Sequence, residues 1–199
     1  MDHPCFRKGG ITCYAQNGEN EYHAIMNNGS CASVHASSIA TALMAFGATI
    51  EVVSTDGEIK EIPIEEFFVT PYEDINKENV LKKGEIITAV TLPSSKKIKS
   101  YYIKQGARAS YDWAIADVAV VLELSGKKCK NAKIVLGAAS PVPVRSESAE
   151  NILVNNGISE NSAIKAAEAS MEKATPLEKN GYKVTIFKSI LKRAILKTV

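Results

Sequence analysis

Strand-like and helix-like segments lie in separate blocks along this chain instead of alternating. A helix and several strands come first, three more strands follow, and the remainder of the chain is helical in pattern. Alternating strands and helices would indicate parallel βαβ units, whereas segregated blocks are typical of an α+β fold. The order of the blocks therefore argues against a doubly wound sheet and predicts the α+β class.

The first block begins with a helix and continues as a hairpin. Apolar residues recur at helical spacing in a segment that starts at Ser37 or Ser38, its candidate N-caps, and stops at Gly47. The β-branched segment ATIEVVS, the turn residues TDG and the alternating segment EIKEIPI predict a β-hairpin. A short turn of helix is expected over residues 65–68, and a further strand, EIITAVTLP, ends at Pro93.

A polar and charged stretch, SSKKIK, separates this block from the next. It reads as a surface linker, so we divide the chain into one unit over residues 1–95 and a second over residues 96–199. The second unit is expected to hold three strands followed by three helices. The strands are placed at residues 101–108, 116–124 and 129–139, and the helices at 146–154, from Ser159 onward, and at 186–195.

The composition excludes several classes of protein. The 199 residues include 24 Lys and Arg against 22 Asp and Glu, and this near-balance argues against a dedicated nucleic-acid binder. No apolar run approaches the ~18–20 residues that a membrane span requires. Four cysteines at uneven spacing are too few for a disulfide scaffold, so a cytoplasmic location is the default expectation.

The first 30 residues are rich in glycine and show little apolar periodicity. A loop of this length is usually functional or disordered, and at the start of a chain it suggests a first half that lies elsewhere. Cys5 and Cys13 fall in this loop and Cys31 just after it, without a C-x-x-C pair that would indicate zinc. An iron–sulfur cluster usually takes four thiolates, and only three cysteines lie in or near this loop. Free or buried thiols are therefore the alternative to a cluster.

Other catalytic signals are weak in the residues alone. His3, His23 and His35 stand beside no nucleophile motif, and we interpret them as hydrogen-bonded loop residues. The chain contains neither the G-x-x-x-x-G-K-[ST] nor the G-x-G-x-x-G phosphate-binding pattern. Without further comparison, the residues indicate only a globular α+β protein.

The ordered set of segments resembles a known family. RKGGITCYAQNGENEYHAI, CASVHASSIATALMAFGATIEVV, GEIITAVTLP, YYIKQGARASYDWAIADVAVVLEL and AKIVLGAASPVPVRSESAE follow one another as in the flavin-binding medium subunit of molybdenum hydroxylases. That family includes xanthine dehydrogenase and carbon monoxide dehydrogenase, and the similarity covers essentially the whole chain.

The resemblance implies a fold in two parts. The first would be the second half of an FAD-binding domain, with a mixed sheet and helices. The second would be a C-terminal domain in which a three-stranded antiparallel sheet packs on a helical bundle. Family members also carry an earlier subdomain whose glycine-rich loops hold the FAD pyrophosphate, and this chain has no counterpart. A separate polypeptide is one expected source of that half.

The resemblance also implies individual site residues. Lys104, in IKQGAR, matches a lysine near the flavin ring, with an ordinary surface lysine as the alternative. Ile87 matches an aliphatic residue on the ring, with a plain core residue as the alternative. Ser38 stands where relatives carry the aspartate of a P-S-D motif, and its loss removes a charge-assisted acceptor. We therefore expect FAD binding to be weak or dependent on a partner.

Some anaerobic relatives carry a 4Fe–4S cluster in a cysteine-bearing loop at this point of the chain. The resemblance matches Cys5 and Cys13 to two of its ligand positions, adds Cys31 as a candidate, and puts another ligand upstream of Met1. A 4Fe–4S cluster is thus a candidate cofactor of the intact assembly.

The implied function is that of part of an electron-transferring flavoprotein subunit. Substrate would be hydroxylated on a molybdenum-cofactor subunit, and electrons would pass through a 2Fe–2S subunit to FAD and then to an acceptor such as NAD. The alternative is a non-catalytic assembly or scaffold protein that keeps the docking fold without binding FAD.

Overall fold

The computed structural model describes residues 4–94, 98–109, 111–126 and 128–199. Residues 95–97, within the predicted linker, therefore lie outside the described residues. A short 3₁₀ helix, η1 (Phe6–Lys8), is followed by a long segment of turns and loops. The first half then continues with α1 (Ser38–Phe46), β1 (Thr49–Val53), β2 (Ile59–Pro63), α2 (Ile64–Phe67) and β3 (Ile86–Thr91).

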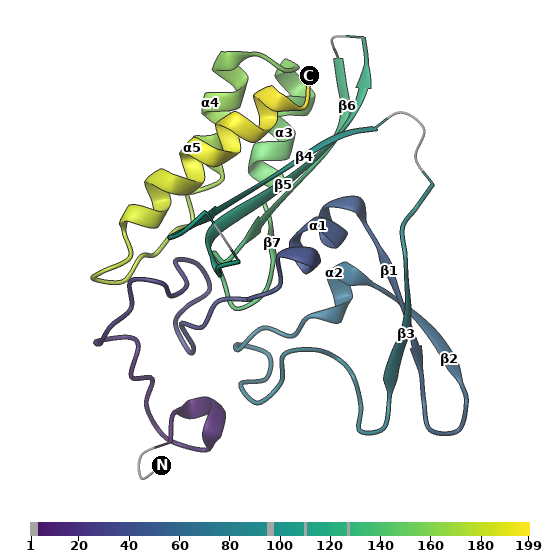
Figure 1. The fold of residues 1–199 in the computed structure, drawn as a ribbon, viewed down its shortest axis with the longest axis vertical. Coiled ribbons are helices and arrows are strands. Elements are labelled where there is room, and N and C mark those ends of the chain that lie inside the picture. Colours follow the sequence, from purple (N-terminus) through teal and green to yellow (C-terminus); the bar gives the residue numbers. More distant parts are fainter. Residues whose placement is uncertain (1–3, 95–97, 110, 127) are drawn as a thin grey trace.

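The second half contains four strands and three helices (Figure 1). The strands are β4 (Ile98–Gly106), β5 (Ala114–Ser125), β6 (Lys128–Gly137) and the two-residue β7 (Val144–Arg145). The helices are α3 (Glu147–Asn156), α4 (Glu160–Ala169) and α5 (Tyr182–Lys197). The predicted α+β class is confirmed, because each block of strands and each block of helices falls where the sequence pattern put it.

The smaller sheet has the order β2-β1-β3 and is antiparallel at both pairings, instead of the mixed sheet that the resemblance implied. The physical reason lies in the connections. Parallel neighbours require a crossover of a dozen or more residues, usually through a helix. Here β1 and β2 are joined by a tight turn in which Gly57 has φ 83°, which permits only an antiparallel pair.

The larger sheet has the order β4-β5-β6-β7, also antiparallel throughout. It has one strand more than the three expected, because Val144 and Arg145 pair with Leu136 and Val135 at its edge. A strand of two residues carries too little alternation to be visible in a sequence pattern.

Both faces of the larger sheet are covered. On one face α3 packs on β6 and α5 packs on β5, with α4 against these two helices, and on the other face α1 packs on β5 and β6 with α2 beside it (Figure 1). In β5, Val118, Val120 and Leu122 belong to the first core, and Ala119 and Val121 belong to the second. A strand that is buried on both faces reads as a continuous apolar run instead of an alternating one. This explains the uninterrupted run in β5 and shows that the first half of the chain shares a core with the second.

Local capping follows the predicted chemistry at two helices. The Ser37 hydroxyl accepts a hydrogen bond from the Ala40 amide at 3.1 Å at the start of α1, and Gly47 ends that helix at φ 68°. At α4, Ser159 and Ser162 form a reciprocal capping box. Ser146 precedes α3 as predicted, but its side chain makes no capping bond. Among the described residues, no helix is both long enough and apolar enough to span a membrane.

Candidate functional site

A cavity of about 530 Å³ lies between the segment that leads into α1 and the start of β5. Ligand pockets commonly measure ~300–1,000 Å³ and combine apolar walls with a few polar groups. Most of the wall here is apolar or aromatic. The lining residues are Tyr22, Val34, His35, Ala36, Ser38, Ala107, Arg108, Asp112, Trp113, Ala114, Ile115, Asp117 and Ala138.

The polar end of the cavity is built on a buried aspartate. Asp117 is 1% exposed, and its Oδ2 accepts a hydrogen bond from the Tyr102 hydroxyl at 2.7 Å. Burial raises the pKa of Asp117, since a carboxylate loses hydration inside the protein. Burial also raises the pKa of Tyr102. These two side chains lie on the face of the sheet that α1 covers, close to Ser38 at the first turn of that helix.

Asp117 fits only because the neighbouring strand carries a glycine. A Cβ at Gly137 would lie 1.9 Å from Asp117 Oδ1 and 2.2 Å from Thr41 Oγ1. The aspartate therefore occupies the space that a side chain on β6 would take. A carboxyl group in a predominantly apolar strand is the sequence signal by which this residue could have been found.

Lys104 lies opposite Asp117 in the β4–β5 register and is exposed. Its Nζ donates to the backbone oxygen of Asp112 at 2.8 Å, so the ammonium is held at the rim of the cavity. The Asp112 carboxylate accepts hydrogen bonds from Arg108 Nε at 3.4 Å and from the Trp113 amide at 3.0 Å. The bond from Arg108 contributes most to the lowered pKa of Asp112. Lys104 is thus tied to the loop that carries Trp113.

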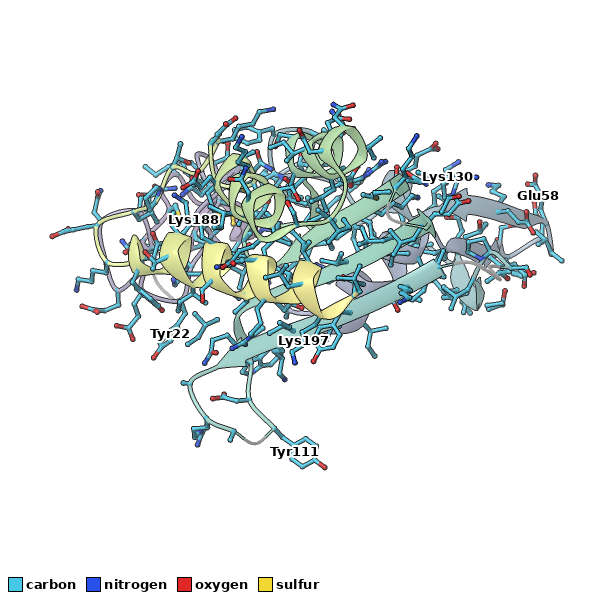
Figure 2. All side chains as sticks on the ribbon, turned by 90° about the horizontal axis from the view of Figure 1, so that it is seen from above. Tyr22, Glu58, Tyr111, Lys130, Lys188 and Lys197 are labelled. Atoms are coloured by element: carbon cyan, nitrogen blue, oxygen red, sulfur yellow. The ribbon has the colours of Figure 1, made fainter. Side chains whose placement is uncertain are left out.

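Aromatic side chains border the cavity on its open side. Trp113 is 74% exposed and Tyr22 is 53% exposed, although both line it. Tyr111 stands at the tip of the loop between β4 and β5 and points away from the rest of the molecule (Figure 2). Aromatic rings at the mouth of an apolar cavity suit a planar ligand, because they offer large contact area at low entropic cost.

His35 lines the cavity, but its ring nitrogen Nε2 does not face the open space. Its Nε2 is buried and has no hydrogen-bond partner among the described residues, and its ring packs edge-on against Phe68 at 4.8 Å. Burial lowers the pKa of His35, which favours the neutral imidazole. The sequence predicts a hydrogen-bonded loop histidine, whereas the structure leaves Nε2 of His35 buried without a partner among the described residues.

The structure brings together two of the three residues that the resemblance assigned to the flavin. Ser38 lines the cavity and Lys104 lies at its rim. Ile87 lies on β3 in the smaller sheet, is 42% exposed and does not line the cavity. Strand register could not place Ile87 relative to Ser38 and Lys104, because β3 belongs to a different sheet from β4.

The three candidate cluster cysteines do not form a metal-binding group in the part of the chain that the structure describes. Cys5 and Cys13 are partly exposed in the N-terminal segment. Cys31 is buried, and its Sγ lies 3.2 Å from Ser33 Oγ. Cys129 is a buried free thiol in β6.

Comparison with known proteins places both halves of the chain. The family profile described as the FAD binding domain in molybdopterin dehydrogenase matches residues 24–95, and that of the CO dehydrogenase flavoprotein C-terminal domain matches residues 101–198. The aldehyde oxidoreductase FAD-binding subunit PaoB of Escherichia coli K12 is 31% identical over 149 residues, which are 74% of this chain and 46% of that protein. The nicotine 6-hydroxylase medium subunit of Paenarthrobacter nicotinovorans is 33% identical, over 64% of this chain and 42% of that protein.

Solved structures agree in fold. Quinoline 2-oxidoreductase from Pseudomonas putida 86 matches with a TM-score of 0.70 and 23% identity, over 90% of this chain and 59% of that one. Carbon monoxide dehydrogenase from Hydrogenophaga pseudoflava matches with a TM-score of 0.70 and 24% identity, over 80% of this chain and 55% of that one. The chain spans about half the length of the curated relatives it matches. From the two profiles and these relatives, we conclude that the chain belongs to the family of medium, FAD-binding subunits of molybdenum hydroxylases.

Proposed function

We propose that this chain forms the ring-side part of the flavoprotein subunit in a molybdenum-dependent hydroxylase. In that role it would pass electrons from iron–sulfur centres through FAD to an acceptor. The observation that carries the proposal is the cavity, which has Ser38 in its wall and Lys104 bound at its rim. Its partners would be a molybdenum-cofactor subunit, where the organic substrate reacts, and a 2Fe–2S subunit.

The residues of the cavity fit the ring end of a flavin. The walls are largely apolar and aromatic, as a planar heteroaromatic group requires. FAD, when bound, supplies the redox chemistry, and the protein supplies orientation and electrostatics. Lys104 contributes a fixed positive charge that favours negative charge on a neighbouring ligand.

The same cavity offers little for the rest of the cofactor. None of the glycines in the N-terminal segment lines it. Backbone amides of glycine-rich loops are the usual seat of a pyrophosphate. One hydrogen bond to a charged group contributes only ~1.5–3 kcal/mol, which must offset an association cost of ~4 kcal/mol or more. We therefore propose that the chain alone binds FAD with a Kd of ~1 mM. A second polypeptide with pyrophosphate-binding loops would lower this Kd.

An assembly role without FAD is the second candidate. Ser38 favours it, because a hydroxyl replaces the charged acceptor that the resemblance places at this position. Such a protein would dock onto the other subunits through the same fold. The two candidates differ in whether a flavin enters the cavity.

FAD titration of the purified chain separates them. Trp113 is the chain's single tryptophan, so its indole N–H gives one NMR signal that reports on the cavity. We expect this signal to shift with a Kd of ~1 mM, and we expect Lys104→Ala to weaken binding by about tenfold. Lys99→Ala is the matched control, because Lys99 lies on the same strand with its side chain on the opposite face.

No shift at any FAD concentration, with or without the pyrophosphate-binding polypeptide, would favour the assembly role. Submicromolar binding by the chain alone would contradict the dependence on a partner. Equal weakening by Lys104→Ala and Lys99→Ala would remove Lys104 from the site.

A further inference from the structure

Lys183 is a fully buried lysine in the first turn of α5. Its placement is unfavourable on two counts, since burial removes the hydration of an ammonium and the start of a helix repels a cation. Its Nζ is compensated by three backbone carbonyls, donating to Tyr22 O at 3.3 Å, His23 O at 2.9 Å and Ala138 O at 2.8 Å. We call this set of contacts the carbonyl junction.

The carbonyl junction joins two walls of the cavity. Tyr22 lines it from the N-terminal segment and Ala138 lines it from the end of β6. Ala138 has φ 56°, in the left-handed region that is costly for any residue with a Cβ. The backbone just after β6 thus adopts a strained turn at the residue whose carbonyl accepts from Lys183.

Neighbouring hydrogen bonds also tie the N-terminal segment to the residues after β6 and to the loop before α5. The Ile25 and Met26 amides donate to Ala139 O at 2.8 and 3.0 Å. Asn180, just before α5, donates to His23 O at 3.2 Å and to Ala24 O at 3.1 Å. Among these hydrogen bonds, those of Lys183 are the charged ones and lie nearest the cavity.

We propose that Lys183 is a positioning residue for the cavity, holding the Tyr22 wall against the Ala138 wall without touching the ligand. The identity of that ligand as a flavin rests on the function proposed above. The positional role rests only on the contacts of Lys183. Without its ammonium, three carbonyls would lose a donor, and the N-terminal segment would open at the cavity before the helical side of the sheet is affected.

The test compares three variants of the full chain. Lys183→Met removes the charge but keeps the length of the side chain, and Lys183→Arg keeps a cation with several N–H donors. Lys179→Met is the control, because Lys179 reaches the same segment through an exposed ion pair to Glu19 at 2.6 Å. Amide hydrogen exchange is read at residues 24–26 and in α4, together with the FAD-induced shift of the Trp113 indole signal.

In Lys183→Met we expect exchange at residues 24–26 to accelerate by at least about tenfold while α4 changes less than about twofold, which is the pattern of local opening. The indole shift at a fixed FAD concentration should fall by about fivefold or more, with partial recovery in Lys183→Arg. Lys179→Met should resemble the unmodified chain.

Equal acceleration at residues 24–26 and in α4, or an unchanged indole shift in a folded Lys183→Met protein, would overturn the proposal. If Lys183→Met does not fold, Lys183→Arg is judged by the same two criteria. If the unmodified chain shows no FAD response, the proposed function fails, and the exchange pattern alone decides the role of Lys183.

Discussion

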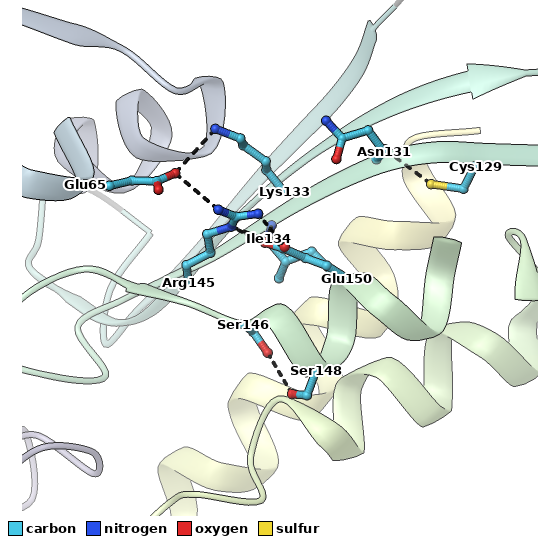
Figure 3. Close-up of polar contacts among 9 residues, drawn as sticks. All are labelled: Glu65, Cys129, Asn131, Lys133, Ile134, Arg145, Ser146, Ser148 and Glu150. Carbon is cyan, nitrogen blue, oxygen red and sulfur yellow. Dashed lines mark hydrogen bonds and ion pairs between the residues drawn. The ribbon is translucent and has the colours of Figure 1, made fainter. Parts of the chain in front are cut away.

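Two junctions tie the first half of the chain to the larger sheet, and they differ in what surrounds their charged side chains. The carbonyl junction surrounds one fully buried ammonium with neutral backbone oxygens. The other, which we call the ionic junction, consists of Glu65, Lys133, Arg145 and Glu150 (Figure 3). There Glu65 Oε1 on α2 lies 3.3 Å from Lys133 Nζ and 3.4 Å from an Arg145 nitrogen.

The ionic junction is itself uneven. The Glu150 side chain is 6% exposed and takes three hydrogen bonds from Arg145, at 2.9, 3.2 and 2.9 Å, together with one from the Ile134 amide at 2.9 Å. The Glu65 side chain is 41% exposed and accepts only at its two long contacts. Exposed ion pairs typically contribute ~0.2–1 kcal/mol, whereas a buried group left without its partner costs more. The comparison indicates that burial, more than formal charge, determines how much each contact contributes to stability.

The largest effect is expected at the buried end of the ionic junction. Glu150→Ala leaves the Ile134 N–H without an acceptor and the Arg145 guanidinium without its main partner. We expect the free energy of unfolding to fall by about 2–3 kcal/mol, measured by urea denaturation. Glu150→Gln keeps an acceptor of the same shape and should lose less. A loss below about 0.5 kcal/mol in Glu150→Ala would contradict the ranking by burial.

The carbonyl junction should give a distinctive pH dependence. Burial lowers the pKa of Lys183 to about 8, against an ordinary value of 10.5. Between these values the unfolded chain binds more protons than the folded one, so the contribution of Lys183 to stability rises with pH. The unfolding free energy of the unmodified chain, relative to Lys183→Met, should increase by about 2 kcal/mol from about pH 7 to about pH 9.5. Tyr22, His23 and Asp117 also face this region, and because the charge of Lys183 helps to lower the pKa of His23, the difference contains this coupling as well as the titration of Lys183 itself. A difference that stays flat or decreases with pH would show that Lys183 is not desolvated as the structure has it.

The smallest effect is expected at the exposed end of the ionic junction. Glu65→Ala removes contacts to two partly exposed cations, and we expect a loss below about 1 kcal/mol. The loss should shrink further at high salt, because exposed charges are screened. Urea denaturation at low and high ionic strength measures both. A large loss of stability that does not depend on salt would show that Glu65 behaves like the buried Glu150 and would contradict the comparison.

The local elements were predictable because their signals are local. Ser37, Gly47 and Ser159 fix helix ends through bonds to residues a few positions away. The mixed sheet that the resemblance implied was wrong, since both pairings are antiparallel and the tight β1–β2 turn favours this for the first pair. The short β7 was missed because two residues show no period.

The candidate site was predictable only in part. Lys104 and Ser38 came from the resemblance, and the structure places them at one cavity. His35 and Asp117 were not identified as site residues. An unpaired imidazole nitrogen is a property of the surrounding atoms, and the fit of Asp117 depends on Gly137 in another strand.

By itself, the sequence determined the α+β class, most element boundaries and the resemblance to the medium-subunit family, since periodicity, caps and turns act over a few residues. The tertiary structure decided which charges are buried. Lys183 reads as an ordinary lysine at the start of a helix, yet it bonds carbonyls 45, 160 and 161 residues away in the chain. Whether a charged side chain is solvated or buried depends on segments that come together only on folding. Lys183 is buried behind the cavity because the N-terminal segment and the residues after β6 pack around it.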